Sequence, residues 1–417
     1  MLAPALVASP HAHAPVSIER TMRLVMLALL PATLLGLWQF GWPAIFLFLV
    51  TLGAALLFEA LALILAGKPL KPSLLDGSAL LTGWLLALTL PPWAPWWIGV
   101  VGAFVAIIVG KQVFGGLGQN LFNPAMVARV VLLVSFPLEM TQWVGPHPLF
   151  FAPAPTVGDA LSISLDGLAA PWDAMSGASL LGQVDLARQQ GQDLGAAMPA
   201  LFPPLGALLG GIPGSLGETS ALLLLLGGLF LLRQGVIDWV IPVAVLLGVV
   251  LPASLLHLID PTRFAGPLLH LLAGATLLTA FFIATDPVTS PVSRIGQAVF
   301  GAGIGLLIYL IRTFGAYPEG AAFAILLMNA ATPMLDHYLK PRIFGRDRRG
   351  QPLPVPEEAT GQAAGRAVGR AAGQAAGRAT GQAADPATGR AADPATGRAA
   401  DQAAGRAAHQ AAGEGKR

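Results

Sequence analysis

The stretch Ser78-Ala-Leu-Leu-Thr-Gly-Trp-Leu-Leu-Ala-Leu-Thr-Leu-Pro91 decides how this chain is organised. It is apolar almost throughout, but it is shorter than the roughly 20 residues that a helix needs to cross a bilayer. A similar stretch, Gly274-Ala-Thr-Leu-Leu-Thr-Ala-Phe-Phe-Ile-Ala-Thr-Asp-Pro287, lies in the second half of the chain. Likeness between segments of the two halves is typical of membrane proteins that are built from internal repeats. The pair therefore predicts a membrane protein with two related halves.

The composition agrees with a membrane location. Hydrophobic residues make up 55% of the chain and charged residues 11%, whereas a soluble globular domain carries about 25% charged residues. We expect an all-α integral membrane fold of about ten transmembrane helices. The predicted spans are 22–40, 43–66, 78–92, 96–113, 123–137, 219–234, 237–256, 267–285, 297–314 and 318–338.

Two of these spans, 78–92 and 123–137, are expected to be short or broken, since the first ends at two prolines and the second begins with Asn123-Pro124. Five spans in each half is an odd number. Two copies of such a half enter the membrane from opposite sides, which predicts two inverted five-helix repeats. Chance likeness between apolar helices is the alternative explanation.

Basic residues set the expected orientation, because cytoplasmic loops carry an excess of Lys and Arg. Arg20 and Arg23 precede the first span, Lys111 ends the fourth, and a basic cluster follows the tenth. Ten spans place these residues on one side, so we expect both termini in the cytoplasm. The predicted organisation is a cytoplasmic N-terminus without a cleavable signal (1–21), a first membrane half (22–137), a periplasmic loop (138–218), a second membrane half (219–344) and a tail (345–417).

The tail repeats Ala-Ala-Gly-Arg and Ala-Asp-Pro-Ala-Thr-Gly-Arg units and has almost no large apolar residues. Such a segment cannot bury enough surface to offset the entropy of its chain. We therefore expect a disordered extension, whose arginines can contact anionic membrane lipid.

The residue content excludes or disfavours several functions. The chain has no cysteine, which excludes disulfides, cysteine-ligated iron–sulfur clusters and thiol catalysis. Its seven histidines lack the i, i+4 partners of a helical metal site, so no metal is expected. The glycines of Gly301-Ala-Gly303-Ile-Gly305 lie inside an apolar span, where small residues indicate close helix packing. No P-loop and no nucleic-acid-binding pattern is present.

A polar segment joins the fourth and fifth spans and includes Gly118, Asn120 and Asn123. Glycine allows close approach of the backbone, and asparagine offers hydrogen bonds without charge. Pro124 suits the first turn of a helix, where free N–H groups can meet an anionic or carbonyl-bearing ligand. A simple cytoplasmic turn is the alternative.

Glu59 and Arg129 are ionisable residues inside predicted spans. Such groups are costly in lipid and usually face the protein interior or a pathway. Glu59 is a candidate for an ion pathway, and a hydrogen bond to a neighbouring helix is the alternative.

Three polar blocks carry a resemblance to a known family. They are His270–Thr276 continuing to Thr285-Asp286-Pro287-Val288-Thr289, then Gly115–Met126, and Arg312–Gly320. Over about residues 8–345 the chain resembles RnfD, the D-type membrane component of the Rnf ion-translocating electron transport complex. NqrB, the corresponding B-type component of the sodium-pumping NADH:quinone oxidoreductase, is a more distant match. The tail lies outside the resemblance.

The resemblance implies a subunit of a redox complex in the bacterial cell inner membrane. That complex couples electron flow between ferredoxin and NAD to the movement of Na⁺ or H⁺. The expected partners are the other subunits of the complex (A, B, C, E and G type). The chain is not expected to be a complete enzyme alone, because no NADH site and no iron–sulfur ligands are visible in it.

The family also implies FMN joined through its phosphate to a hydroxyl side chain, within the pattern Asp-x-x-Ser/Thr-Gly-Ala-Thr/Ser. Asp173-Ala-Met-Ser176-Gly177-Ala178-Ser179 fits this pattern. Ser179 is then the covalent attachment residue, and Asp173, Ser176, Gly177 and Ala178 form the recognition motif for a periplasmic FAD-dependent flavin transferase. The family usually has threonine at the last position. A flexible loop is the alternative, because Ser, Gly and Ala are common in loops.

Thr276 is a rival attachment residue, but His270 stands where the pattern has aspartate and the segment lies inside a span. We therefore expect Thr276, Gly118, Asn120, Asn123 and Asp286 to line a buried site for a second, noncovalent flavin. A flavin-free solute channel or transporter with an inverted-repeat fold is the rival class of function.

Overall fold

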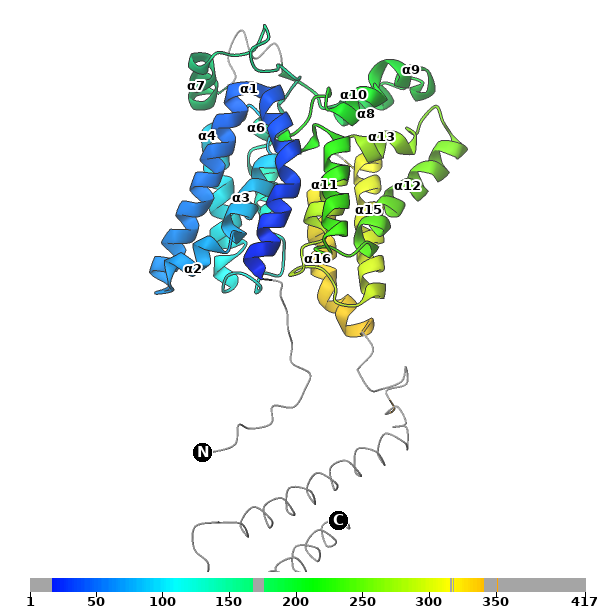
Figure 1. Ribbon diagram of the computed structural model, residues 1–417. Coiled ribbons are helices and arrows are strands. Elements are labelled where there is room, and N and C mark those ends of the chain that lie inside the picture. Colours follow the sequence, from blue (N-terminus) through cyan, green and yellow to red (C-terminus); the bar gives the residue numbers. More distant parts are fainter. Residues whose placement is uncertain (1–16, 168–175, 316, 318, 341–350, 352–417) are drawn as a thin grey trace, which may run out of the picture. The chain divides into compact units, whose positions relative to one another are not determined.

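The computed structural model describes residues 17–167, 176–315, 317, 319–340 and 351. The described chain is mainly helical, and most of its longer helices run in roughly the same direction (Figure 1). Most of the predicted N-terminal segment, all of the predicted tail except Gln351, and Asp173 lie outside the described residues.

Helix α1 (Ile18–Leu65) contains the first two predicted spans. Its two limbs meet at Gly41, whose φ of 74° and ψ of −158° are not helical. A positive φ favours glycine, which has no Cβ to clash with the backbone. Figure 1 shows the chain reversing at this point, so the two limbs run in opposite directions. The Gln39 carbonyl accepts a 2.8 Å hydrogen bond from the His147 N–H, which holds the following loop over the turn.

The rest of the first half consists of shorter helices. These are α2 (Leu70–Leu75), α3 (Ser78–Thr89), α4 (Trp96–Phe104) and α5 (Pro124–Ser135). Helix α3 stops before Pro91 because proline lacks the N–H that would continue it. Helix α4 runs on through a π turn (Val105–Val109), and Asn123 caps α5 through its Oδ1.

The segment between the halves is built of short elements, as its Gly, Ala and Pro content indicates. They are α6 (Pro137–Thr141), β1 (Trp143–Val144), α7 (Val157–Asp166), β2 (Ser176–Gly177), α8 (Leu180–Gln189), α9 (Leu194–Leu201) and α10 (Pro204–Leu209). Strands β1 and β2 pair antiparallel, with Trp143 opposite Gly177. This pairing brings the end of the predicted flavin motif beside the end of α5.

The second half contains α11 (Ala221–Arg233), α12 (Val240–Ile259), α13 (Pro267–Leu272), α14 (Thr276–Leu278), α15 (Arg294–Phe314) and α16 (Ala321–Tyr338). Helix α14 continues into a π turn (Thr279–Ile283). The break between α13 and α14 contains Gly274, with a φ of 69°. A Cβ there would collide with Arg312 and Glu319. The second half therefore contains a broken helix, which runs from Pro267 to Ile283 and is called here the second broken helix, while the short α3, which ends before Pro91, is called the first.

Four helical segments are long and apolar enough to cross a membrane: Ile18–Leu65, Trp96–Phe114, Val240–Ile259 and Arg294–Phe314. Ser78–Thr89, Pro124–Ser135 and Ala221–Arg233 are shorter apolar helices. Leu247, Leu251 and Leu255 on α12 are exposed at four-residue spacing, which suits a helix face in contact with lipid. Helical segments overlap all ten predicted ranges, whereas the number of crossings and the inverted repeat remain predictions.

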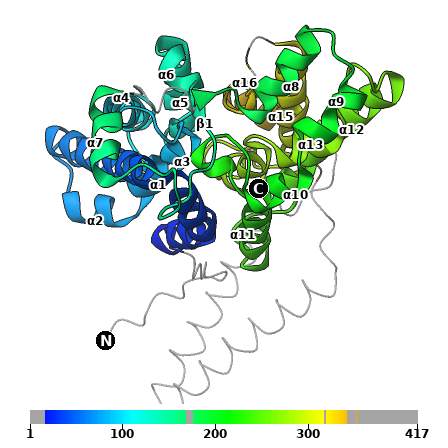
Figure 2. The ribbon, with the colours of Figure 1, turned by 90° about the horizontal axis from the view of Figure 1, so that it is seen from above.

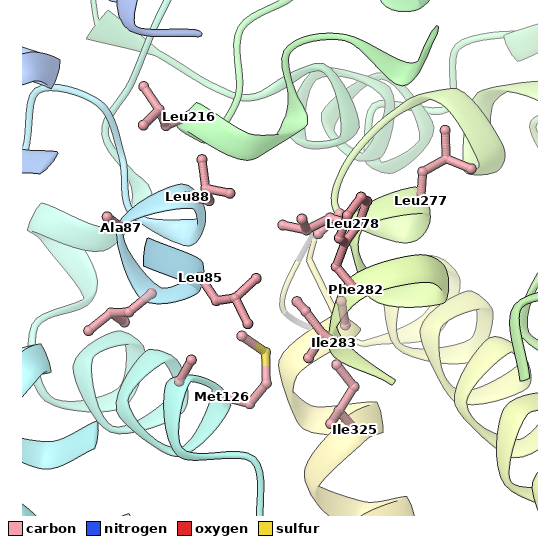
Figure 3. Packing of buried hydrophobic residues seen from close by; sticks show 14 of the residues in the cluster. Leu85, Ala87, Leu88, Met126, Leu216, Leu277, Leu278, Phe282, Ile283 and Ile325 are labelled. Carbon is pink, nitrogen blue, oxygen red and sulfur yellow. The ribbon is translucent and has the colours of Figure 1, made fainter. Parts of the chain in front are cut away.

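The main hydrophobic core joins the two halves, which Figure 2 shows as two groups of helices seen from above. Leu85 and Leu88 of α3 face Leu278 and Phe282 of the second broken helix, and Met126 of α5 lies beside them (Figure 3). The two stretches that resemble each other in sequence thus meet at the centre of the molecule. The polar groups at their ends lie next to this core.

Candidate functional site

A cavity of about 100 Å³ lies between the halves and is named here the Asn123 cavity. Its wall combines residues from the start of α1, from α3, from the segment before α5 and from the end of the second broken helix. Three of the predicted site residues, Asn120, Asn123 and Asp286, line it together. Gly118 is not part of its wall, and neither is Thr276.

The polar groups of the Asn123 cavity are held by short local hydrogen bonds. Asn123 Oδ1 accepts from the Ala125 N–H at 3.1 Å, and Asn120 Nδ2 donates to the Phe122 carbonyl at 3.0 Å. Asp286 accepts from the Val288 N–H at 3.1 Å, while burial raises the pKa of this carboxyl above its ordinary value. Phe281 and Phe282 add aromatic surface. The cavity therefore offers amide and carboxyl groups beside flat apolar rings.

A buried ion pair reaches the wall of this cavity, because Lys111 and Ser78 both line it. Lys111 Nζ is 2.8 Å from Glu59 Oε1 and donates to Ser78 Oγ at 2.8 Å. Ser78 Oγ in turn donates to Asp76 Oδ1 at 2.6 Å. Glu59 is therefore paired across helices, and its Oε2 is buried without a partner in the described part of the chain.

The role of Lys111 differs from the sequence interpretation, in which it was one of the cytoplasmic orientation charges. Its residue is 2% exposed, so it lies inside the protein. The signal for this pairing was available, because a carboxylate in an apolar span requires a partner. Lys111 is a basic residue at the end of the neighbouring fourth span.

Ser179 lies at the other end of α5. It is the N-cap of α8, where its Oγ accepts a 3.2 Å hydrogen bond from the Gly182 N–H, and the residue is 6% exposed. It lines a small cavity of about 20 Å³, named here the Ser179 cavity. The other lining residues are Arg129, Leu133, Met140, Thr141, Trp143, Tyr317 and Glu319.

The remaining motif residues are placed only in part. Ser176 and Gly177 form β2, and Ala178 is exposed with its carbonyl accepting from Gln183 Nε2 at 3.0 Å. Asp173 lies outside the described residues.

Arg129 is a buried cation in the wall of the Ser179 cavity. Its guanidinium lies 5.7 Å from the centre of the Trp143 ring, and its Nη1 is 3.8 Å from Met140 Sδ. Within the described residues it forms no ion pair. The nearby Glu319 carboxylate already accepts from Arg312 Nη2 at 2.6 Å and from the Ala275 N–H at 3.2 Å.

Thr276 belongs to a separate network that closes the break between α13 and α14. Its Oγ1 donates to the His270 carbonyl at 2.7 Å and accepts from Arg312 Nη1 at 2.8 Å. Arg312 is buried and also pairs with Glu319. The hydroxyl of Thr276 is thus engaged in holding the broken helix, away from the Asn123 cavity.

No group of three or more His, Asp or Glu side chains that could hold a metal ion occurs in the residues that the structure describes. The residues that line the two cavities offer hydrogen-bonding groups, aromatic surface and charged side chains.

These features define a multi-pass membrane protein with polar sites beside broken helices. The chain belongs to the NQR2, RnfD, RnfE family, whose model matches residues 5–345. This match confirms the resemblance that the polar motifs indicated.

Curated relatives cover nearly the same region. A protein of Halorhodospira halophila is 53% identical over 353 residues, which is 85% of this chain and 99% of that protein. A protein of Stutzerimonas stutzeri is 53% identical over 337 residues, covering 81% of this chain and 95% of its own length. A Rhodobacter capsulatus protein is 52% identical over 305 residues, which cover 73% of this chain and 84% of that protein. Each of these relatives is named as the D-type component of an ion-translocating oxidoreductase complex.

Proposed function

We propose that this chain is the membrane subunit of an ion-translocating oxidoreductase complex and carries FMN covalently bound to Ser179. The name shared by the relatives supports the complex. In this proposal the chain relays electrons between the ferredoxin-side and NAD-side subunits, coupled to transport of Na⁺ or H⁺. The complex lies in the bacterial inner membrane, and the other subunits complete the enzyme.

The placement of Ser179 is the observation that carries the flavin proposal. Its hydroxyl stands at the start of α8, where free backbone N–H groups and the helix dipole favour a phosphate. Arg129 lines the same cavity and adds a positive charge. The donor set therefore fits a phosphoester on Ser179.

The space in the Ser179 cavity also constrains the proposal. A volume of about 20 Å³ holds roughly one water molecule, so the isoalloxazine ring must lie outside it. Thr141 on its wall is exposed, which gives the cavity a surface opening. When bound, FMN would supply the one- and two-electron chemistry, while the chain holds its phosphate.

Attachment requires one substitution at phosphorus. Ser179 Oγ attacks the FAD phosphorus that bears riboflavin, the P–O–P bond breaks, and AMP leaves. The hydroxyl proton passes to a base of the periplasmic flavin transferase. The residue is 6% exposed, so the transferase must act before the segment around Ser179 packs down, or while it is open.

The Asn123 cavity is proposed to hold a second, noncovalent flavin. Asn120 and Asn123 offer amide groups to the polar edge of a flat ring, and Phe281 and Phe282 offer apolar contact. Asp286 is half-buried, and desolvation raises the pKa of its carboxyl above the ordinary value, so in its protonated form it can donate to a carbonyl. Amides, a carboxyl and aromatic rings together suit a heteroaromatic ligand better than a simple ion.

The coupling ion is proposed to use the polar groups beside Glu59. The hydrogen-bonded row from the half-buried Asp76 through Ser78 and Lys111 to Glu59 leads from the surface into the buried interior. The proposed framework is ten spans in two inverted repeats, with both termini cytoplasmic. The overlap of helices with all ten ranges and the meeting of the two broken helices support it.

A flavin-free transporter is the second candidate, favoured by the Asn123 cavity between the halves. In-gel flavin fluorescence of the purified chain, made together with its transferase, separates the two. Fluorescence that survives denaturation and is lost in Ser179→Ala but kept in Thr276→Ala supports the flavin-carrying redox function. A wild-type chain with no covalent fluorescence, but with solute uptake in liposomes, supports the transporter.

A further inference from the structure

We infer that Arg129 is the positioning residue that holds the phosphoester on Ser179, through a charge-assisted contact inside the Ser179 cavity. This inference rests on the proposed function. It adds a defined role for a buried arginine that lies 50 positions away along the chain. Strand β1, which pairs with β2 just before Ser179, brings the two residues together.

The burial of Arg129 is the first observation. A guanidinium has five N–H donors and stays charged inside proteins. Here the described surroundings give it a thioether sulfur at 3.8 Å and the face of Trp143. A cation–π contact and a weak sulfur acceptor replace little of the hydration that a buried cation loses. The arginine therefore has donors available for an anion.

The neighbouring carboxylates do not fill this role. Glu319 lines the same cavity, but its Oε1 is shared by Arg312 and the Ala275 N–H. Glu218 is bonded to the Ser215 hydroxyl at 2.7 Å. Neither forms an ion pair with Arg129 in the described structure. A phosphodiester, with one negative charge and two free oxygens, matches a guanidinium in charge and geometry.

The position of Ser179 is the second, independent observation. Its Oγ faces the first turn of α8, a helix of 10 residues. An ester at this atom places the phosphate between the N–H groups of α8 and the guanidinium of Arg129. The helix and the arginine then act on the same anion from two sides.

The test compares loaded and unloaded forms of the full chain, purified in detergent after expression with or without the flavin transferase. Four chains are measured: wild type, Arg129→Gln, Arg129→Lys and Thr141→Val. Thr141 is the matched control, because it lines the same cavity but its hydroxyl already donates to the Pro137 carbonyl at 2.7 Å. The readouts are the rise in the thermal unfolding midpoint on loading and the ³¹P resonance of the phosphoester.

Loading should raise the midpoint of the wild type and of Thr141→Val by roughly 3 °C or more. In Arg129→Gln this rise should fall by at least half, and the ³¹P resonance should move. The rise in the unfolding midpoint of Arg129→Lys should lie between those of the wild type and Arg129→Gln. Lysine keeps the positive charge but lacks the planar guanidinium that can donate two parallel hydrogen bonds. Loss of labelling in Arg129→Gln with an unchanged unloaded midpoint also supports the inference.

The following results would reject the role of Arg129 in positioning the phosphoester. If Arg129→Gln lowers the unloaded midpoint but keeps the full rise and the same ³¹P resonance, Arg129 is a packing residue only. If Arg129→Gln does not fold, the ³¹P resonance of Arg129→Lys decides, and an unmoved resonance rejects the contact. If the wild-type chain carries no flavin on Ser179, the proposed function itself fails. This outcome is distinguishable from a failure of the Arg129 role alone, in which the wild-type chain is labelled.

Discussion

Lys111 Nζ and Glu59 Oε1 lie 2.8 Å apart in a pair whose side chains are 3% and 2% exposed. The pair connects the second limb of α1 to the segment that follows α4, across 52 positions of the chain. A buried pair of this kind is weak support for the stability of a fold, yet breaking it by removing one partner is costly.

Removing one partner of this pair should therefore destabilise the chain more than removing both. We expect Lys111→Met to lower the free energy of unfolding by about 3–5 kcal/mol, because it leaves an uncompensated carboxylate. The double variant Lys111→Met/Glu59→Leu should recover much of this loss. Thermal unfolding of wild type, Lys111→Met, Glu59→Leu and the double variant in detergent measures these losses. Simple addition of the two single losses in the double variant would contradict the pairing.

Asn123 has two roles that substitutions can separate. Asn123→Ala should lose the cap of α5 and destabilise it by about 1 kcal/mol, whereas Asn123→Asp keeps a capping oxygen. Both remove the side-chain amide N–H donor of a residue that lines the Asn123 cavity. We expect both variants to lose noncovalent flavin, assayed by extraction and fluorescence, with covalent flavin unchanged. Retention of extractable flavin in both variants would show that the cavity does not bind it.

Gly274 should not tolerate a side chain. Its φ is 69°, and a Cβ would meet Arg312 and Glu319 at the helix break. Gly274→Ala should cost about 1–3 kcal/mol. Gly53→Ala is the matched control, since no heavy atom lies within 4 Å of its added Cβ. Equal unfolding midpoints for the two variants would argue against the break as described.

His147 gives a pH-dependent prediction. Burial lowers the pKa of this imidazole below its ordinary value of 6.5. The unfolded chain therefore binds a proton at higher pH than the folded chain. The contribution of the neutral form is complete above the unfolded pKa and is lost as the pH falls through 6.5 toward the folded pKa.

Between about pH 7.5 and 5.5 the wild-type unfolding midpoint should fall more steeply than that of His147→Gln. The backbone N–H of residue 147 still reaches the Gln39 carbonyl in this variant, so the loop anchor is preserved. Identical slopes for the two chains would show that His147 is not responsible for the pH dependence.

Local sequence signals predicted much of the architecture. Two prolines end α3, and Asn123-Pro124 begins α5, as their chemistry requires. Of the five residues expected to line a buried site, Asn120, Asn123 and Asp286 lie in the wall of one cavity, whereas Gly118 and Thr276 do not. Such contacts between distant segments depend on packing that one sequence alone does not encode in a readable pattern.

The partners of several polar and charged side chains were not predicted from the sequence. Lys111 was interpreted as an orientation charge near the membrane surface, and it is instead a buried partner of Glu59. Arg129 was recognised as costly in lipid, but its position beside Ser179 follows from the β1–β2 pairing. Thr276 was expected in a ligand wall and is held by Arg312 and His270. Lys111 and Glu59 are 52 positions apart, and Thr276 and Arg312 are 36 positions apart.

The central claim is that Ser179 carries FMN. Mass spectrometry of the proteolytic peptide that contains Ser179, from chain produced together with a flavin transferase, tests it most directly. The claim predicts a mass increase equal to FMN less one water, fragments that assign the addition to Ser179, and its absence in Ser179→Ala. An unmodified Ser179 peptide, or an FMN-sized addition on Thr276, would contradict it.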